Sequence, residues 1–354
     1  MMVMTVINER FSNARSGIGL TRQDKQRGRK QTAFFCAMTT TAILSFSALA
    51  QPLSQSPITS DDAGLSTSPM GCHNVSVQIL GSGGPELDDG RTSSAYVVWV
   101  NGSARVLVDA GSGSSVQFGA AGATFESLEV ILLSHLHTDH SADLPSFVKG
   151  GYFTDREKDL IIMGPEGNDI MPSTNTYVSS LIGKNGAFKY LSSYTIEGQD
   201  DYTISTKSIG ATTFEQPFKR NVNDSVSVEA MTVNHGPIPA LAWKVKANGC
   251  EAVFSGDTND KQGNLARFAN NADLLVLHNA IGDDAGQVAK NLHMTPTQII
   301  DIAAQSNAKQ IVLSHIMKRS EPGLDALTEA ITVVAEGRVY AAEDLMNITL
   351  SEQE

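Results

Sequence analysis

The stretch Ile131-Leu-Leu-Ser-His-Leu-His-Thr-Asp-His140 decides how this chain is organised. Its apolar beginning, Val130 to Leu133, is rich in branched side chains and predicts a short buried strand. Within the six residues that follow stand four side chains that bind metals: His135, His137, Asp139 and His140. Side chains at positions i and i+2 of an extended segment point the same way, so His135 and His137 can hold one ion together. Asp139 and His140 come after the chain begins to turn and can reach a second ion.

The types of side chain in this stretch indicate which metals to expect. Imidazole nitrogens combined with a carboxylate suit zinc, iron or manganese better than calcium. A lone histidine is more often a satisfied core or surface residue, but three histidines and an aspartate at one strand end favour a metal site. We therefore expect two divalent metal ions as cofactors, zinc first, with manganese or iron as alternatives.

The spacing His-x-His-x-Asp-His resembles the metal motif of the metallo-β-lactamase superfamily, and the resemblance extends over roughly residues 74–350. Within that superfamily, the flanking segments look most like the branch that holds ribonuclease Z and the secreted arylsulfatase-type hydrolases. The resemblance implies an α/β fold, the four-layer αβ/βα metallo-β-lactamase sandwich. The sequence pattern agrees with α/β layers, because strands alternate with helices in two successive halves of the chain.

The same resemblance implies a complete set of metal ligands. The first ion would be held by His135, His137 and His235, and the second by Asp139, His140 and His315. Asp257, which follows Phe254-Ser-Gly, would be shared by both ions. Such a pair of ions makes hydroxide available near neutral pH and stabilises the charge that develops on an ester oxygen. Asp109, at another strand end, matches the acidic residue that orients the ligands in related enzymes.

Two residues are expected to act directly in catalysis, Asp139 and His293. His293 matches the histidine that assists the leaving group in ribonuclease Z, and a general acid there would be worth ~10²–10⁴ in rate. The alternative for His293 is a hydrogen bond to the start of the helix that Thr295 caps. His278 also ends a strand, but Asn279 replaces the acidic residue that ribonuclease Z usually carries. This departure weakens the ribonuclease interpretation.

The first 50 residues have the layout of a secretory signal peptide. A basic run from Arg22 to Lys30 precedes an apolar stretch that closes with the small-x-small pattern Ala48-Leu49-Ala50. We expect a signal peptide over residues 1–50, a flexible linker over 51–73 and a catalytic domain over 74–354, with a periplasmic or secreted location. An uncleaved anchor is the alternative for the apolar stretch, while no other segment predicts a membrane span. In the oxidising compartment that export implies, Cys72 and Cys250 could form a disulfide.

Removal of residues 1–50 would leave 19 basic and 36 acidic side chains, a net charge of −17. Such a charge repels polyanions at long range, so we expect no nucleic acid as a partner. Ribonuclease Z carries a basic arm for transfer RNA between the equivalents of residues 166 and 225, where Lys184 and Lys189 are too few to serve that purpose. We expect a small-molecule ester as the substrate, and a homodimer is allowed.

The predicted function is therefore an exported binuclear hydrolase of small esters, with aryl sulfate esters as the first choice. The first alternative is a phosphodiesterase that acts on cyclic nucleotides or other phosphodiesters, because one site can handle either tetrahedral ester. A β-lactamase or lactonase comes next. The alternative outside hydrolysis is a diiron redox scaffold, which predicts tightly bound iron and no hydrolysis.

Overall fold

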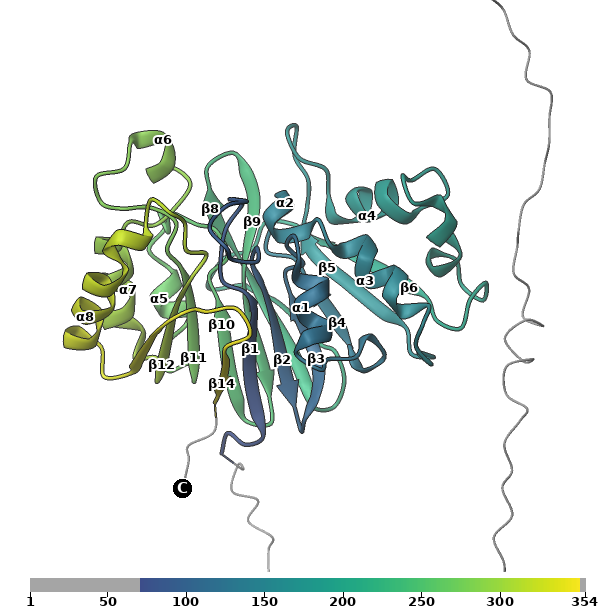
Figure 1. Cartoon of the computed structure of the whole chain (residues 1–354), viewed down its shortest axis with the longest axis horizontal. Coiled ribbons are helices and arrows are strands. Elements are labelled where there is room, and N and C mark those ends of the chain that lie inside the picture. The colour runs from purple at the N-terminus through teal and green to yellow at the C-terminus, as the bar shows by residue number, and fades with distance from the viewer. Residues whose placement is uncertain (1–70, 351–354) are drawn as a thin grey trace, which may run out of the picture. The chain divides into compact units, whose positions relative to one another are not determined.

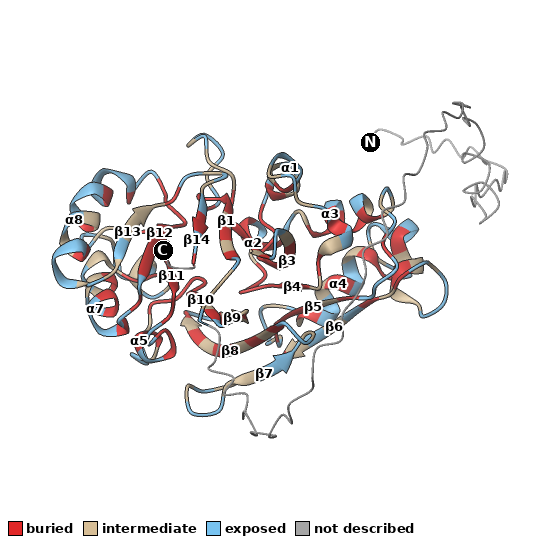
Figure 2. Ribbon diagram, turned by 90° about the horizontal axis from the view of Figure 1, so that it is seen from below, coloured by how far each residue is buried: buried red, intermediate tan, exposed pale blue. Residues whose placement is uncertain are grey.

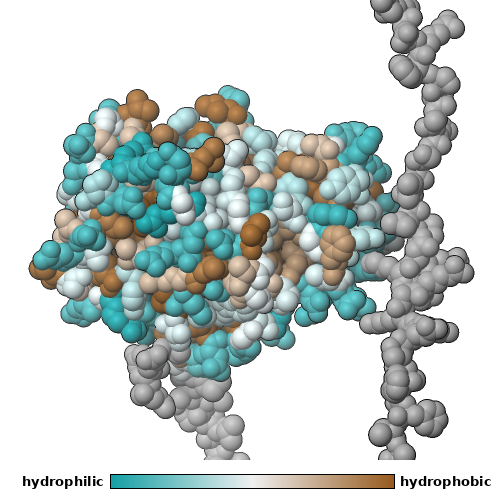
Figure 3. Space-filling view, viewed as in Figure 1, coloured by the Kyte–Doolittle hydropathy of each residue, from teal (hydrophilic) through white to brown (hydrophobic). Residues whose placement is uncertain are grey.

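A computed structural model of the chain describes residues 71–350. The predicted signal peptide and most of the predicted linker lie outside these residues. Two seven-stranded sheets face each other, with helices on their outer sides (Figure 1). No helix among residues 71–350 is long and apolar enough to cross a membrane. On the face that Figure 3 shows, apolar residues are dispersed among hydrophilic ones.

The first sheet has the strand order β14-β1-β2-β3-β4-β5-β6, and β3 to β6 run parallel to one another. Its strands are β1 (Val75–Gly81), β2 (Ala95–Val100), β3 (Ser103–Val108), β4 (Val130–Leu132), β5 (Leu160–Pro165), β6 (Ile204–Ile209) and β14 (Asn347–Thr349). The helices α1 (Ser114–Ala120), α2 (Thr138–Ser141), α3 (Leu144–Gly151) and α4 (Thr174–Ile182) belong to this half, with the short 3₁₀ turns η2 (Phe125–Ser127) and η3 (Lys189–Thr195).

The second sheet has the order β13-β12-β11-β10-β9-β8-β7 and repeats the plan, with β10 to β13 parallel. Its strands are β7 (Phe218–Asn221), β8 (Val226–His235), β9 (Ile238–Ala247), β10 (Cys250–Phe254), β11 (Leu274–His278), β12 (Gln310–Ser314) and β13 (Arg338–Ala341). Its helices are α5 (Leu265–Phe268), α6 (Gln287–Lys290), α7 (Pro296–Ser306) and α8 (Leu324–Val334), with the 3₁₀ turn η4 (Glu321–Gly323). Thr295 and Gln298 form the capping box that begins α7.

The alternation of side chains along β2 shows how the layers form. Tyr96 and Val98 belong to the core that the two sheets share, whereas Ala95 and Val97 pack in a second core with α1, α3 and α4. Since neighbouring side chains of a strand point to opposite faces, a strand that is apolar on both faces must be covered on both. Figure 2 shows the resulting pattern, in which buried residues fill the sheets and the inner faces of the helices.

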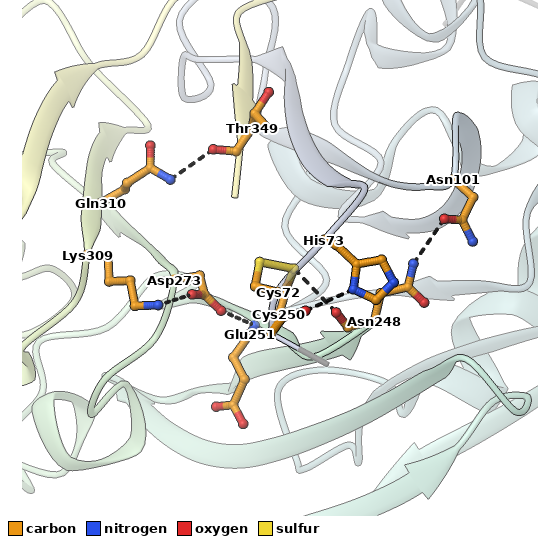
Figure 4. The surroundings of a disulfide bond; sticks show 11 residues. Cys72, His73, Asn101, Asn248, Cys250, Glu251, Asp273, Lys309, Gln310 and Thr349 are labelled. Carbon is orange, nitrogen blue, oxygen red and sulfur yellow. Dashed lines mark hydrogen bonds and ion pairs between the residues drawn. A yellow bond between two sulfur atoms is a disulfide. The ribbon is translucent and has the colours of Figure 1, made fainter. Parts of the chain in front are cut away.

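Cys72 and Cys250 form a disulfide, as the sequence predicted, with their Cα atoms 4.4 Å apart. The bond joins the segment before β1 to the first residue of β10, so it ties the first sheet to the second (Figure 4). The backbone N–H of His73 also donates to the carbonyl of Asn248 at 3.3 Å. The last residues of the predicted 51–73 linker are therefore held against the folded domain.

Candidate metal centre

Five of the seven candidate metal ligands stand at or just beyond the ends of strands, and Asp139 and His140 lie in the short helix α2. His135 and His137 follow β4, His235 is the last residue of β8, Asp257 follows β10 and His315 follows β12. Parallel strands bring their carboxyl ends to one edge of a sheet, and here the edges of both sheets meet. The seven residues predicted as ligands are thus collected in one place, although His315 lies 180 positions after His135 in the sequence.

Contacts between the two halves fix the end of β4. The indole of Trp243 on β9 donates to the carbonyl of Leu133 at 3.0 Å, and the N–H of Leu241 donates to the carbonyl of Ser134 at 2.9 Å. The turn that carries Asp257 also packs closely against β9. A Cβ added to Gly256 would lie 2.8 Å from the carbonyl oxygen of Leu241, and its φ of +57° also favours glycine.

The first group of ligands consists of His135, His137 and His235, whose ring nitrogens lie within 4.8 Å of one another. His137 Nδ1 is 3.0 Å from His135 Nε2 and 3.4 Å from His235 Nε2. Two nitrogens that bind one zinc ion tetrahedrally at ~2.0–2.1 Å stand about 3.3 Å apart. The three rings therefore converge as ligands of a single ion would.

The second group lies against the first and contains His140, His315 and Asp139. Asp139 Oδ2 is 3.2 Å from His315 Nε2 and 3.5 Å from His140 Nε2. Asp257 stands between the groups, because its Oδ2 lies 3.9 Å from His135 Nε2 and 3.7 Å from His140 Nε2. This is the place that a carboxylate shared by two ions would occupy.

Hydrogen bonds aim the rings into the centre. Asp109 Oδ2 lies 2.8 Å from His140 Nδ1, and the backbone N–H of Ser134 donates to the other oxygen of Asp109 at 2.6 Å. His235 Nδ1 donates to the carbonyl of Leu292 at 2.8 Å. In both histidines the Nδ1 proton is thus engaged, so Nε2 offers a lone pair to the centre. Asp109 has the orienting position that the sequence predicted for it.

The buried carboxylates of the centre favour the binding of cations. Burial disfavours the charged form of His135 and lowers its pKa well below the usual value, which leaves a neutral ligand. Burial also opposes a charge on His140, but Asp139, Asp109 and Asp257 outweigh it and raise its pKa to about 10. Without an ion the carboxylates thus hold a proton on His140. A metal ion would meet the same negative potential and take that place.

The donor set fits two transition-metal ions. Within residues 71–350, the buried Nε2 of His140, which lies 3.5 Å from Asp139 Oδ2, has no hydrogen-bond partner. Imidazoles and carboxylates are the donors that zinc, manganese and iron accept. An unpartnered buried nitrogen is costly unless something binds it, and an ion held with Asp139 and His315 would satisfy this one.

His293, predicted to be catalytic, also lies in the centre. Its Nδ1 is 3.7 Å from Asp257 Oδ2, and its ring centroid is 5.2 Å from that of His235. Burial disfavours the protonated ring and, with positive neighbours, lowers the pKa of His293 to about 3. Its side chain is buried just before the N-cap Thr295, and its Nδ1 has no hydrogen-bond partner among residues 71–350.

His278 received no role from the sequence, but the structure places it inside the cluster. Its Nδ1 lies 2.8 Å from Asp257 Oδ1, and one of its nitrogens belongs to a group with His140, Asp257 and His315. Its place at the end of a strand, which it shares with His235, was the signal that could have found it. The neighbouring Asn279 is buried, and its side-chain amide has no partner within residues 71–350.

Comparisons with known proteins agree with this geometry. The family model described as "Beta-lactamase superfamily domain" matches residues 104–316. The chain is similar to the ribonuclease Z of Methanosarcina mazei, with 29% identity over 302 residues that cover 76% of this chain and 96% of that protein. The ribonuclease Z of Archaeoglobus fulgidus is 23% identical over 301 residues, which cover 78% of this chain and 97% of that protein.

Two solved structures share the fold. The short form of human tRNase Z has a TM-score of 0.60 and 20% identity, and the match covers 78% of this chain and 100% of that chain. The metallo-β-lactamase fold protein YhfI from Bacillus subtilis has a TM-score of 0.58 and 20% identity, covering 77% of this chain and 98% of that chain. The expected four-layer metallo-β-lactamase sandwich is confirmed.

Two expectations from the sequence are wrong. The predicted aryl sulfate ester hydrolase and the predicted exclusion of nucleic acid both conflict with the relatives of this chain. These relatives are named ribonuclease Z, and the match covers almost their whole length. The first error arose because sulfate and phosphate esters place the same demands on a pair of ions. The second arose because net charge describes the field of the whole protein at long range. A centre that held two divalent ions would still attract a phosphate locally.

Proposed function

Because the chain belongs to the metallo-β-lactamase superfamily, we propose that it is a metal-dependent phosphodiesterase that works at the centre around Asp257. The observation that carries the proposal is the pair of adjoining ligand groups, three histidines on one side and Asp139, His140 and His315 on the other, with Asp257 between them. When bound, two ions supply Lewis-acid polarisation of a phosphoryl oxygen and a hydroxide nucleophile near neutral pH.

The side chains of this protein would supply the rest of the chemistry. Asp109 and the carbonyl of Leu292 hold the rings of His140 and His235 in place, so the centre does not have to reorganise during the reaction. Since the pKa of His293 is lowered to about 3, its ring is neutral in the free protein. In our proposal it gains a proton only when an anionic phosphodiester binds, and then gives it to the leaving group.

RNA is the substrate favoured by the names of the relatives, and a small phosphodiester such as a cyclic nucleotide is the second candidate. The test uses zinc-loaded and manganese-loaded protein with three substrates: a structured RNA with a single-stranded tail, a cyclic nucleotide and an aryl phosphodiester. We expect hydrolysis of at least one of them that a chelator stops. The matched control is Asp257→Asn, which keeps the shape of the side chain and removes its charge. Absence of cleavage of all three by metal-loaded protein would refute the proposal.

We also propose that the protein is exported to the periplasm or secreted. The signal-peptide pattern of residues 1–50 supports this, and so does the disulfide between Cys72 and Cys250, a bond that persists in oxidising compartments. Expression of the whole gene, followed by fractionation and N-terminal sequencing, tests the proposal. A mature chain that begins at Gln51 is expected, whereas a full-length chain in the cytoplasm would exclude export.

A further inference from the structure

A chain of hydrogen bonds reaches Asp257 from the opposite sheet. The side chain of Tyr96, on β2, is fully buried in the core between the sheets. Its hydroxyl oxygen lies 3.0 Å from His278 Nε2 and 2.9 Å from the hydroxyl of Ser314. His278 Nδ1 in turn lies 2.8 Å from Asp257 Oδ1. One tyrosine of the first sheet is thus connected to the carboxylate at the middle of the centre.

The direction of these hydrogen bonds follows from the groups involved. An ionised carboxylate only accepts, so the proton between His278 and Asp257 belongs to His278 Nδ1. In a neutral imidazole the other nitrogen then accepts, so the Tyr96 hydroxyl, which donates to Ser314 Oγ at 2.9 Å, shares its proton with His278 Nε2 at 3.0 Å. Burial raises the pKa of Tyr96, which keeps the phenol protonated.

This chain of donors distinguishes the two oxygens of Asp257. Oδ1 accepts from His278 and lies 3.4 Å from His315 Nε2, a member of the second group only. Oδ2 lies 3.7 Å from His140 Nε2 and 3.7 Å from His235 Nε2, one member of each ligand group. If the hydrogen bond were absent, the carboxylate could rotate about its last bond and present either oxygen to either group. Both nitrogens of His278 are occupied, so no lone pair remains with which this ring could bind an ion.

We propose that Tyr96 and His278 are positioning residues that lock the Asp257 carboxylate with Oδ2 toward both ligand groups. The inference rests on the two-metal centre and not on the choice of substrate. Removal of a group that hydrogen-bonds to a metal ligand and orients it typically lowers metal affinity about 10–100-fold. The effect of the pair should therefore appear in metal binding itself, before any substrate is added.

Three variants separate this role from a general effect on folding. His278→Leu removes both hydrogen bonds, and His278→Asn keeps an N–H that can donate to Asp257 but loses the connection to Tyr96. Tyr96→Phe removes only the outer donor. Zinc affinity is measured by competition with a chromophoric chelator, and the visible spectrum of the cobalt-loaded protein reports the ligand geometry. We expect affinity to fall about 10–100-fold in His278→Leu, about 2–10-fold in Tyr96→Phe, and to recover largely in His278→Asn.

The matched control is Tyr202→Phe. Tyr202 is also buried, and its hydroxyl has no hydrogen-bond partner within residues 71–350, but it lies in the outer core of the first sheet. Metal affinity should not change in this variant. The proposal is overturned if His278→Leu binds zinc as the wild type does, or if His278→Asn is no better than His278→Leu. Should His278→Leu fail to fold, unchanged affinity and spectra in both other variants overturn it. An inactive wild type would refute the proposed function and leave these measurements valid.

Discussion

Removing the disulfide should destabilise the protein strongly and leave its chemistry intact. The change is the double variant Cys72→Ser with Cys250→Ser. The two cysteines are 178 positions apart, so the bond closes a very large loop. In the chain-entropy treatment, a cross-link over such a loop lowers the entropy of the unfolded chain enough to stabilise the fold by about 5 kcal/mol at 25 °C. For a domain of this size, the expected fall in Tm is about 10–20 °C.

The double variant should keep the geometry of the metal centre. Cys250 begins β10, and Asp257 follows the other end of that strand, roughly 15–20 Å away at the usual rise per residue. Well below its Tm, the variant should therefore bind metal and hydrolyse substrate like the wild type. Unfolding in urea, followed by fluorescence for oxidised wild type, reduced wild type and the double variant, gives the free energies. The reasoning fails if the double variant unfolds at the same urea concentration as the oxidised wild type.

The other predictions concern the centre. Purified protein should contain about two transition-metal ions per chain, and chelation should abolish hydrolysis until zinc is restored; full activity in metal-free protein would contradict this. Asp109→Asn should weaken metal binding about 10–100-fold, because His140 loses the carboxylate that orients it; titration with zinc measures this, and unchanged affinity would remove the orienting role. His293→Ala should slow phosphodiesters with poor leaving groups far more than nitrophenyl esters, whereas Asp257→Ala should slow all of them. Equal losses across the series in His293→Ala would exclude the acid role.

The sequence alone could predict only those ligands of the centre that lie together in one short segment. His135, His137, Asp139 and His140 stand within six residues, and local geometry alone brings them together. The distant ligands His235, Asp257 and His315 could be placed only through the resemblance to a family. Each follows an apolar strand, but nothing in a strand states which other strand ends lie beside it.

The position of Tyr96 could not be predicted at all. In the sequence it is one apolar residue of an alternating strand, and its hydroxyl meets His278 only because two sheets face each other in one particular register. The secondary structure of residues 166–225 could not be predicted from their sequence either, and the structure has α4, η3, β6 and β7 there. The substrate was predicted wrongly for a different reason. A two-metal centre suits tetrahedral esters, but its ligands do not show whether the central atom is sulfur or phosphorus.

The fold explains why the centre lies where it does and why it needs support from both halves. β1 (Val75–Gly81) begins soon after Cys72 and ends shortly before Gly84, where an added Cβ would lie 2.8 Å from the His315 ring. β10 runs from Cys250 to Phe254, shortly before Asp257. The same two strands thus begin close to a covalent bond between the sheets and end close to the candidate metal ligands. Because the ligands come from both sheets, bound ions would join them at one end as the disulfide does at the other. The hydrogen bond from Tyr96 to His278 connects the sheets between these ties, which allows the packing of the core to control the geometry of Asp257.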